Sequence, residues 1–212
     1  MLRFFGSAAG LELVIGTAYS SGSGRVIRAG PRPASHGREV RWQTYSVGVG
    51  ESRMIFECDF EFPRVIVWDA LVDPDLVSGW LAEAEISPEV GGEYNLHWEH
   101  RAGQPATPGR ITVMQPLERL DVDTADAGRI QFELAELPVG NRGTSTRLRV
   151  TLDDAVDIID AGSAARLKAD WLTNLDQLED LLRGHPVDWA NWDRDRHDAW
   201  FRHLGEAENS TA

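Results

Sequence analysis

The sequence predicts an α+β fold in which a curved antiparallel β-sheet wraps around one long helix near the C-terminus. The first observation is the segment MIFECDFEF (54–62), where every second residue is apolar, as in a half-buried strand. The second is a series of short strand patterns separated by turn residues between Gly91 and Leu152. The third is one apolar helical face formed by Leu167, Trp171, Leu175, Leu178 and Leu182.

The connecting elements follow from local signals. Pro63 ends the first strand and suits the first turn of a helix. A second short helix begins at Asp73-Pro74, with Asp73 as its N-cap, and continues to Trp80 and Leu81. The long helix begins near Ser163 and ends at Gly184, so its roughly 20 residues span about 30 Å and can cross a small sheet.

The 212 residues divide into three segments: 1–52, 53–184 and 185–212. Residues 1–52 are expected to be a flexible N-terminal extension. They either precede a natural start near Met54 or form a loosely attached extension with a strand near Val40–Val47. Residues 53–184 form the main domain, and 185–212 form a helical extension with a polar tail. The extension carries an aromatic face formed by Trp189, Trp192 and Trp200. We expect this face to dock on the domain or across a homodimer, and we favour the domain.

Composition excludes several partners. The net charge is −13 and Lys168 is the single lysine, so no basic stripe is present to bind nucleic acid. Cys58 is the single cysteine, which excludes an internal disulfide and a cysteine-rich metal site and agrees with a cytoplasmic location. No apolar run approaches the length that a membrane-spanning helix needs, so we expect no membrane insertion.

The order and spacing of several short motifs resemble a known family. The chain is similar to the START-like (SRPBCC) superfamily, and within it to homologues of the activator of the 90-kDa heat-shock protein ATPase. The resemblance rests on Pro63, Val67-Trp68, Ala70-Leu71, Asp73-Pro74, Trp80, Gly91-Gly92, Gly109, Pro116 and Leu120. It implies a helix-grip fold with a cavity between sheet and helix, which the superfamily uses for lipids, polyketides and similar apolar ligands. The branch name implies contact with a chaperone.

The main hypothesis is therefore a cytoplasmic protein that binds a small hydrophobic molecule between the sheet and the long helix. Inward-facing apolar residues with few polar groups are the usual lining of such a site. The alternative is that these side chains fill the space completely. The predicted lining is Tyr94, Leu96, Trp98, His100, Ile111, Val113, Phe132, Leu134, Trp171 and Leu175.

Motifs for catalysis and for cofactors are missing, so we expect a binding protein without a cofactor rather than an enzyme. His97 and His100 are three apart on a strand and point to opposite faces, so they cannot bind one metal ion together. Cys58 has no neighbouring base in the sequence and is expected to be a buried, unreactive thiol.

Two other functions stay open. One is a cyclase or hydrolase that uses the same cavity, with His100, Tyr94, Arg110 and Asp170 as candidate acid, base or orienting groups. The other is a chaperone-associated module that acts through its surface. A buried ionisable group with a shifted pKa beside the cavity would favour the enzyme. A sealed core with a large exposed apolar patch would favour the interaction module.

Overall fold

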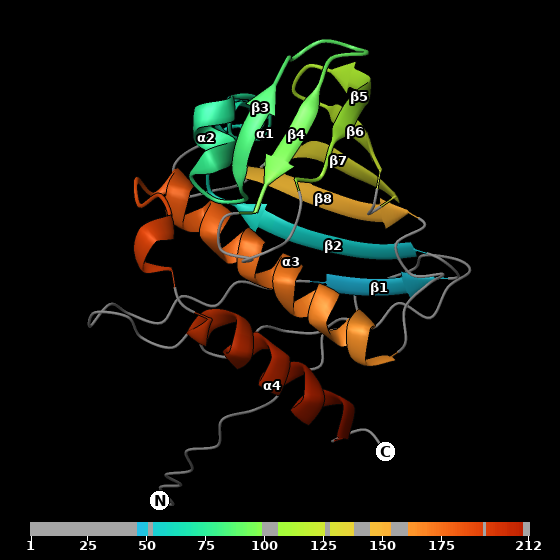
Figure 1. Ribbon diagram of the computed structural model, residues 1–212, viewed down its shortest axis with the longest axis vertical. Helices are drawn as coiled ribbons and strands as arrows, with labels where there is room; N and C mark the ends of the chain where they lie inside the picture. The colour runs from blue at the N-terminus through green and yellow to red at the C-terminus, as the bar shows by residue number, and fades with distance from the viewer. Residues whose placement is uncertain are drawn as a thin grey trace, which may run out of the picture.

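A computed structural model describes residues 46–50, 53–98, 106–125, 128–137, 145–153, 161–192 and 194–209. Its main sheet has six antiparallel strands in the order β1-β2-β8-β7-β6-β5. A second sheet pairs β3 with β4 (Figure 1). Isolated bridges join Leu96 of β4 to Thr107, and Glu93, just before β4, to Arg110. The strands are β1 (Ser46–Gly50), β2 (Arg53–Phe60), β3 (Glu83–Ile86), β4 (Tyr94–His97), β5 (Gly109–Gln115), β6 (Arg119–Thr124), β7 (Gly128–Leu137) and β8 (Ser145–Asp153).

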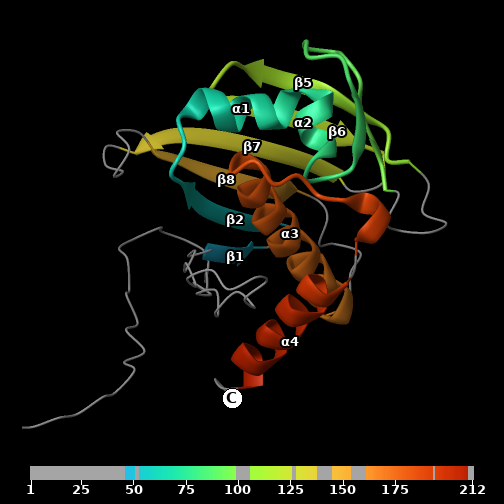
Figure 2. The same cartoon turned by 90° about the vertical axis from the view of Figure 1, so that its left-hand side faces the viewer.

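Helices α1 and α3 contact each other and lie on the same side of the main sheet (Figure 2), which confirms the predicted helix-grip architecture. The long helix α3 crosses the strands, and α4 lies against α3 on the side away from the sheet (Figures 1 and 2). The helices are α1 (Arg64–Val72), α2 (Pro74–Ser78), α3 (Ala161–Leu182), a short 3-10 helix η1 (Trp189–Asn191) and α4 (Asp195–Asn209). No helix within the described ranges combines the length and the hydropathy needed to cross a bilayer.

Several local predictions can be compared directly with the structure. Asp73 caps α2 as predicted, because its carboxylate accepts a hydrogen bond from the backbone N–H of Asp75 at 2.9 Å. α2 ends at Ser78, earlier than predicted, and Trp80 and Leu81 follow it as buried residues. Strand β3 was not predicted. Strand β1 lies inside the range 1–52, close to the strand suggested near residues 40–47.

The outer face of the sheet, turned away from α3, carries a row of alternating charges. Glu57 on β2 lies opposite Arg149 on β8, and their side chains approach to 2.6 Å. Glu133 on β7 lies between Arg149, at 3.8 Å, and Arg119 of β6, at 3.9 Å. Arg119 also holds the buried carboxylate of Asp121 through two hydrogen bonds of 2.7 Å. One continuous ion-pair row thus crosses four strands.

The C-terminal segment docks on its own domain, as favoured from the sequence. Each of its three tryptophans donates its indole N–H to the domain: Trp189 to the Ser78 carbonyl at 2.6 Å, Trp192 to Gln177 Oε1 at 3.0 Å, and Trp200 to Asp176 Oδ2 at 2.9 Å. Arg196 pairs with Asp180 at 2.9 Å. The side of α3 that faces away from the sheet is therefore covered.

The ion-pair row makes a prediction about Glu133. Glu133→Gln should lower the free energy of unfolding by about 0.5 to 1 kcal/mol at low salt, because two arginines lose a shared anion. Urea denaturation at low salt and in 1 M NaCl measures the loss, which should shrink as salt screens the charges. Glu136→Gln is the control, since the exposed Glu136 has one arginine at 3.4 Å. Equal losses in both variants, or a loss that salt leaves unchanged, would contradict the row.

Docking of α4 makes a second prediction. Trp200→Phe keeps an aromatic ring but removes the N–H that meets the buried Asp176, so it should cost about 1 to 2 kcal/mol. Chemical denaturation followed by circular dichroism measures the cost. Phe201→Leu at the adjacent exposed position is the control and should change stability by less than about 0.5 kcal/mol. A Trp200→Phe variant as stable as the parent would show that α4 is not held by this bond.

Candidate functional site

The face of the sheet that α3 covers is built from apolar side chains. Strand pairing sets them in transverse rows, and one row runs from Met54 through Leu152 and Ile130 to Val122 and Ile111. The neighbouring row carries Phe56, Val150, Phe132 and Leu120. All nine residues are buried. Because strand side chains alternate between the faces, this apolar face and the charged outer face belong to the same strands.

Trp171 is the central contact between α3 and this face. Its ring stacks on Phe56 with centroids 6.1 Å apart and lies tilted on Phe132 at 6.3 Å. Leu175 follows one turn later and is fully buried, and Leu167, one turn earlier, packs against the core while staying partly exposed. The sequence left open whether Trp171 covers a cavity or fixes helix to sheet, and these ring contacts place it against the sheet.

On β4 the predicted alternation is present, since Tyr94 and Leu96 are buried. Tyr94 donates its hydroxyl to the carbonyl of Leu71 at 3.1 Å, and Trp80 donates to that of Ala70 at 2.8 Å. The two side chains thereby satisfy carbonyls at the end of α1 that have no partner within the helix. Trp98 is partly exposed and donates its N–H to Thr107 Oγ1 at 2.9 Å. His100 lies outside the described residues.

Among the remaining predicted residues, Ile111, Phe132 and Leu134 are buried on the face toward α3, but Val113 is not there. Ile111 pairs with Val122, and after a register shift at Thr112, Val113 pairs with Asp121 of the outer face. A bulge of one residue reverses the face of every later side chain. The prediction of Val113 as a lining residue is therefore wrong, and Met114 packs against the core in its place.

Burial holds Cys58 and Tyr94, two ionisable residues of the covered face, in their neutral forms. Burial raises the pKa of the Cys58 thiol well above its ordinary value, and the charges of Asp59 and Glu179 raise it further. Burial also raises the pKa of Tyr94. Both effects arise because a charged form loses its hydration in an apolar interior. Cys58 is therefore protonated at neutral pH, as predicted for an unreactive thiol.

The described members of the candidate catalytic set have other contacts. Tyr94 is bonded to Leu71, while Arg110 is exposed and donates to the carbonyl of Gly91. Asp170 lies 3.2 Å from Nε2 of the buried His197, a contact between α3 and α4. Within the described ranges, no group of three or more His, Cys, Asp or Glu side chains is placed to hold a metal ion. The contacts of Tyr94, Arg110 and Asp170 therefore do not bring these side chains together around one reacting position.

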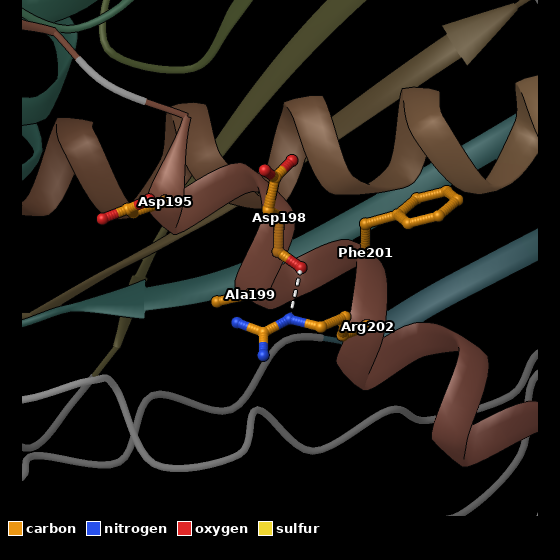
Figure 3. Close-up of a pocket in the computed structure, with 5 residues that line it drawn as sticks. All are labelled: Asp195, Asp198, Ala199, Phe201 and Arg202. Carbon is orange, nitrogen blue, oxygen red and sulfur yellow. Dashed lines mark hydrogen bonds between the residues drawn. The ribbon is translucent and has the colours of Figure 1, made fainter.

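An open hollow of about 650 Å³ lies on α4 and is lined by exposed and half-buried residues (Figure 3). Within this hollow, Nε of Arg202 donates a hydrogen bond to the backbone carbonyl of Asp198 at 3.3 Å. Its lining is Asp195, Asp198, Ala199, Phe201 and Arg202. It contains none of the predicted lining residues and has a charged rim, so it is distinct from the apolar site between α3 and the sheet.

Comparison with solved structures shows the same fold in bacterial proteins. A conserved protein of unknown function from Enterococcus faecalis has a TM-score of 0.54 and 17% identity, with 76% of this chain and 91% of that chain covered. A Rhodobacter sphaeroides protein has a TM-score of 0.52 and 24% identity, covering 66% and 98%. An Aha1 dimer from Colwellia psychrerythraea has a TM-score of 0.50 and 17% identity, covering 61% and 95%. These identities support the fold alone.

A search of curated proteins finds no match. A family match is found, however, over residues 61–183, more than half of the chain, to the family described as activator of Hsp90 ATPase homolog 1-like protein. The match begins just before α1 and ends just after α3. It therefore contains most of the strands and the helix α3, which together form most of the candidate site. The chain therefore belongs to the activator of Hsp90 ATPase homolog 1-like family, within the START-like superfamily.

Proposed function

We propose that this protein binds a small hydrophobic molecule between the six-stranded sheet and α3. The observation that carries the proposal is the apolar character of the covered face. Strands β2, β8, β7, β6 and β5 of the main sheet all contribute buried apolar side chains to it. The family's fold is known for ligand-binding and polyketide cyclase-like proteins, which supports the same function. Lipids and polyketide-like compounds are the ligand classes that we propose.

Binding is favoured over catalysis by the state of the ionisable groups. A general base must be able to release its proton near the working pH. Cys58 and Tyr94 are driven away from that range by burial, and Asp170 is engaged by His197. Nothing in the described part of the covered face supplies an acid and a base together, so no observation favours the cyclase or hydrolase alternative.

A role as an interaction module has less support. The large apolar side chains that are well exposed lie on different elements: Val65 and Ile66 on α1, Val90 in the turn before β4, and Phe201 on α4. Single exposed apolar residues are normal on a soluble protein, and only the first two are neighbours in the chain. Chaperone contact and homodimer formation are therefore outcomes to test. We place the protein in the cytoplasm because its only cysteine is an unpaired thiol.

The proposed function predicts that an apolar ligand co-purifies with the protein. Native mass spectrometry of freshly purified protein should show a mass above that of the chain, and organic extraction should release an apolar compound. A variant with Leu175→Asp on the sheet-facing side of α3 should carry none, because a charge in this interior opposes apolar binding. Circular dichroism must first show that the variant is folded. A parent chain that is always free of ligand, and that takes up no apolar compound on titration, would contradict binding.

The neutral interior predicts slow thiol chemistry. Native Cys58 should react with Ellman's reagent at least about 100-fold more slowly than the unfolded chain at pH 8, because burial raises its pKa and excludes the reagent. Since the folded pKa is raised, the thiol favours the folded state below its ordinary pKa and this contribution is lost as pH rises above about 9. Cys58→Val should therefore weaken the alkaline fall in stability. Rapid reaction of the native thiol at pH 8 would show that the interior is open to charged reagents.

A further inference from the structure

The contact between α3 and α4 contains a buried histidine. His197 lies on α4, which packs along α3 on the side away from the sheet (Figures 1 and 2), and its side chain is 7% exposed. Its Nε2 lies 3.2 Å from Oδ1 of Asp170 on α3. Its Nδ1 lies 3.2 Å from Oδ1 of Asp198, the next residue on α4. Both ring nitrogens therefore meet a carboxylate oxygen.

This geometry suits only one protonation state of the ring. A neutral imidazole has an N–H on one nitrogen and a lone pair on the other, whereas the imidazolium has an N–H on both. An ionised carboxylate can only accept hydrogen bonds. The neutral ring of His197 would donate to one carboxylate and turn its lone pair toward the other. The charged ring donates to both, so these contacts favour the charged form.

Two other bonds between α3 and α4 do not depend on a histidine. Asp176 accepts a hydrogen bond from the indole N–H of Trp200 at 2.9 Å, and Asp180 pairs with Arg196 at 2.9 Å. A guanidinium stays charged at every pH near neutrality, and an indole keeps its N–H. These two bonds therefore hold α4 on both sides of pH 7, whereas the contacts of His197 change with the proton on its ring.

Other charged groups flank the contact. Arg166 on α3 and Arg194 on α4 are exposed, and their guanidinium charges are constant across the neutral range. His203 is a second histidine on α4 and lies edge-on to the ring of Trp200, with centroids 6.0 Å apart. It can titrate in the same range as His197, so the experiment must separate the two histidines.

We propose that His197 is a pH-dependent latch, which holds α4 on α3 while its ring is charged and loosens α4 when the ring loses its proton. Histidine is the side chain that ordinarily changes its charge between about pH 5 and 8. Because the docked state favours the charged ring, the latch contributes fully at low pH and its contribution is lost as the pH rises. Docking of α4 should therefore be tighter at pH 5.5 than at pH 8.0.

The chain between α3 and α4 is attached by bonds that contain no titrating group. The backbone N–H of Val187 donates to the Gly79 carbonyl at 2.8 Å, and the indole of Trp189 donates to the Ser78 carbonyl at 2.6 Å. This connection stays in place when the latch opens. A rise in pH thus loosens α4 alone, which remains tethered, and gives solvent access to the side of α3 that α4 covers.

Hydrogen exchange measured by mass spectrometry on the full chain tests the latch. Exchange of the peptide covering residues 195–204 is compared at pH 5.5 and 8.0, each normalised to the unfolded chain at the same pH. Protection in the parent should fall about fivefold at pH 8.0, since about one hydrogen bond to a charged group is lost. In His197→Gln, which is neutral at both pH values, the fall should be less than about twofold. The peptide covering residues 185–192 should keep its protection.

Three further variants separate a titrating role from a structural one. Asp170→Asn gives a neutral ring an amide N–H to accept from, so its pH dependence should also shrink, and it serves where His197→Gln does not fold. His203→Gln is the matched control on the same helix and should keep the parent's fall. Trp200→Phe removes a bond that does not titrate, so it should lower protection of α4 to the same extent at both pH values.

Each remaining outcome contradicts the latch. Equal protection of α4 at pH 5.5 and 8.0 in the parent would overturn it. A folded His197→Gln or Asp170→Asn variant that keeps the parent's pH dependence would do the same. Loss of the pH dependence in His203→Gln would assign the effect to that histidine. Ligand binding between α3 and the sheet is tested separately, because α4 lies on the opposite side of α3.

Discussion

The structure depends on the burial of α3 from two sides by two chemically different partners. Residues 171–179 are all buried, although they include Thr173, Asp176, Gln177 and Glu179. Apolar side chains on one side pack on the sheet, as a helix-grip fold requires. Polar side chains on the other side are stable in the interior only when they are bonded. The segment after residue 184, beyond the end of the family match at residue 183, supplies bonds to Asp176, Gln177 and Asp180 and thus completes the burial of the central helix.

The distribution of charge follows from the same division of faces. The chain carries a net charge of −13, yet the outer face of the sheet is nearly balanced because acidic residues of one strand meet arginines of the next. Directly opposed charges of unlike sign stabilise cross-strand pairs and disfavour a shift in register, which would bring like charges together or bury them. The excess of acid lies elsewhere, including the exposed Asp75 after the α2 N-cap and Glu83 and Glu85 on β3. Specific pairing of the sheet is therefore compatible with strong overall acidity.

Sequence patterns predicted the architecture well wherever a period was long enough. The alternation of Tyr94 and Leu96 and the helical repeat from Leu167 to Leu182 are both present, because the burial of one face imposes these periods. Val113 was misplaced because the bulge at Thr112 changes the phase, and RITVM contains no charged residue after Arg110 to reveal it. Strand β3 had a signal in Glu83-Ala84-Glu85-Ile86, but four residues are too few to be decisive.

The cover of α3 could not have been read from an amphipathic pattern, because that pattern does not say whether water or another helix meets the polar side. The sequence gives no sign that Gln177 is bonded at both ends of its carboxamide. These bonds come from neighbours in three dimensions, because the Trp80 carbonyl and the Trp192 indole reach Gln177 from segments that are distant in the chain or lie beyond α3.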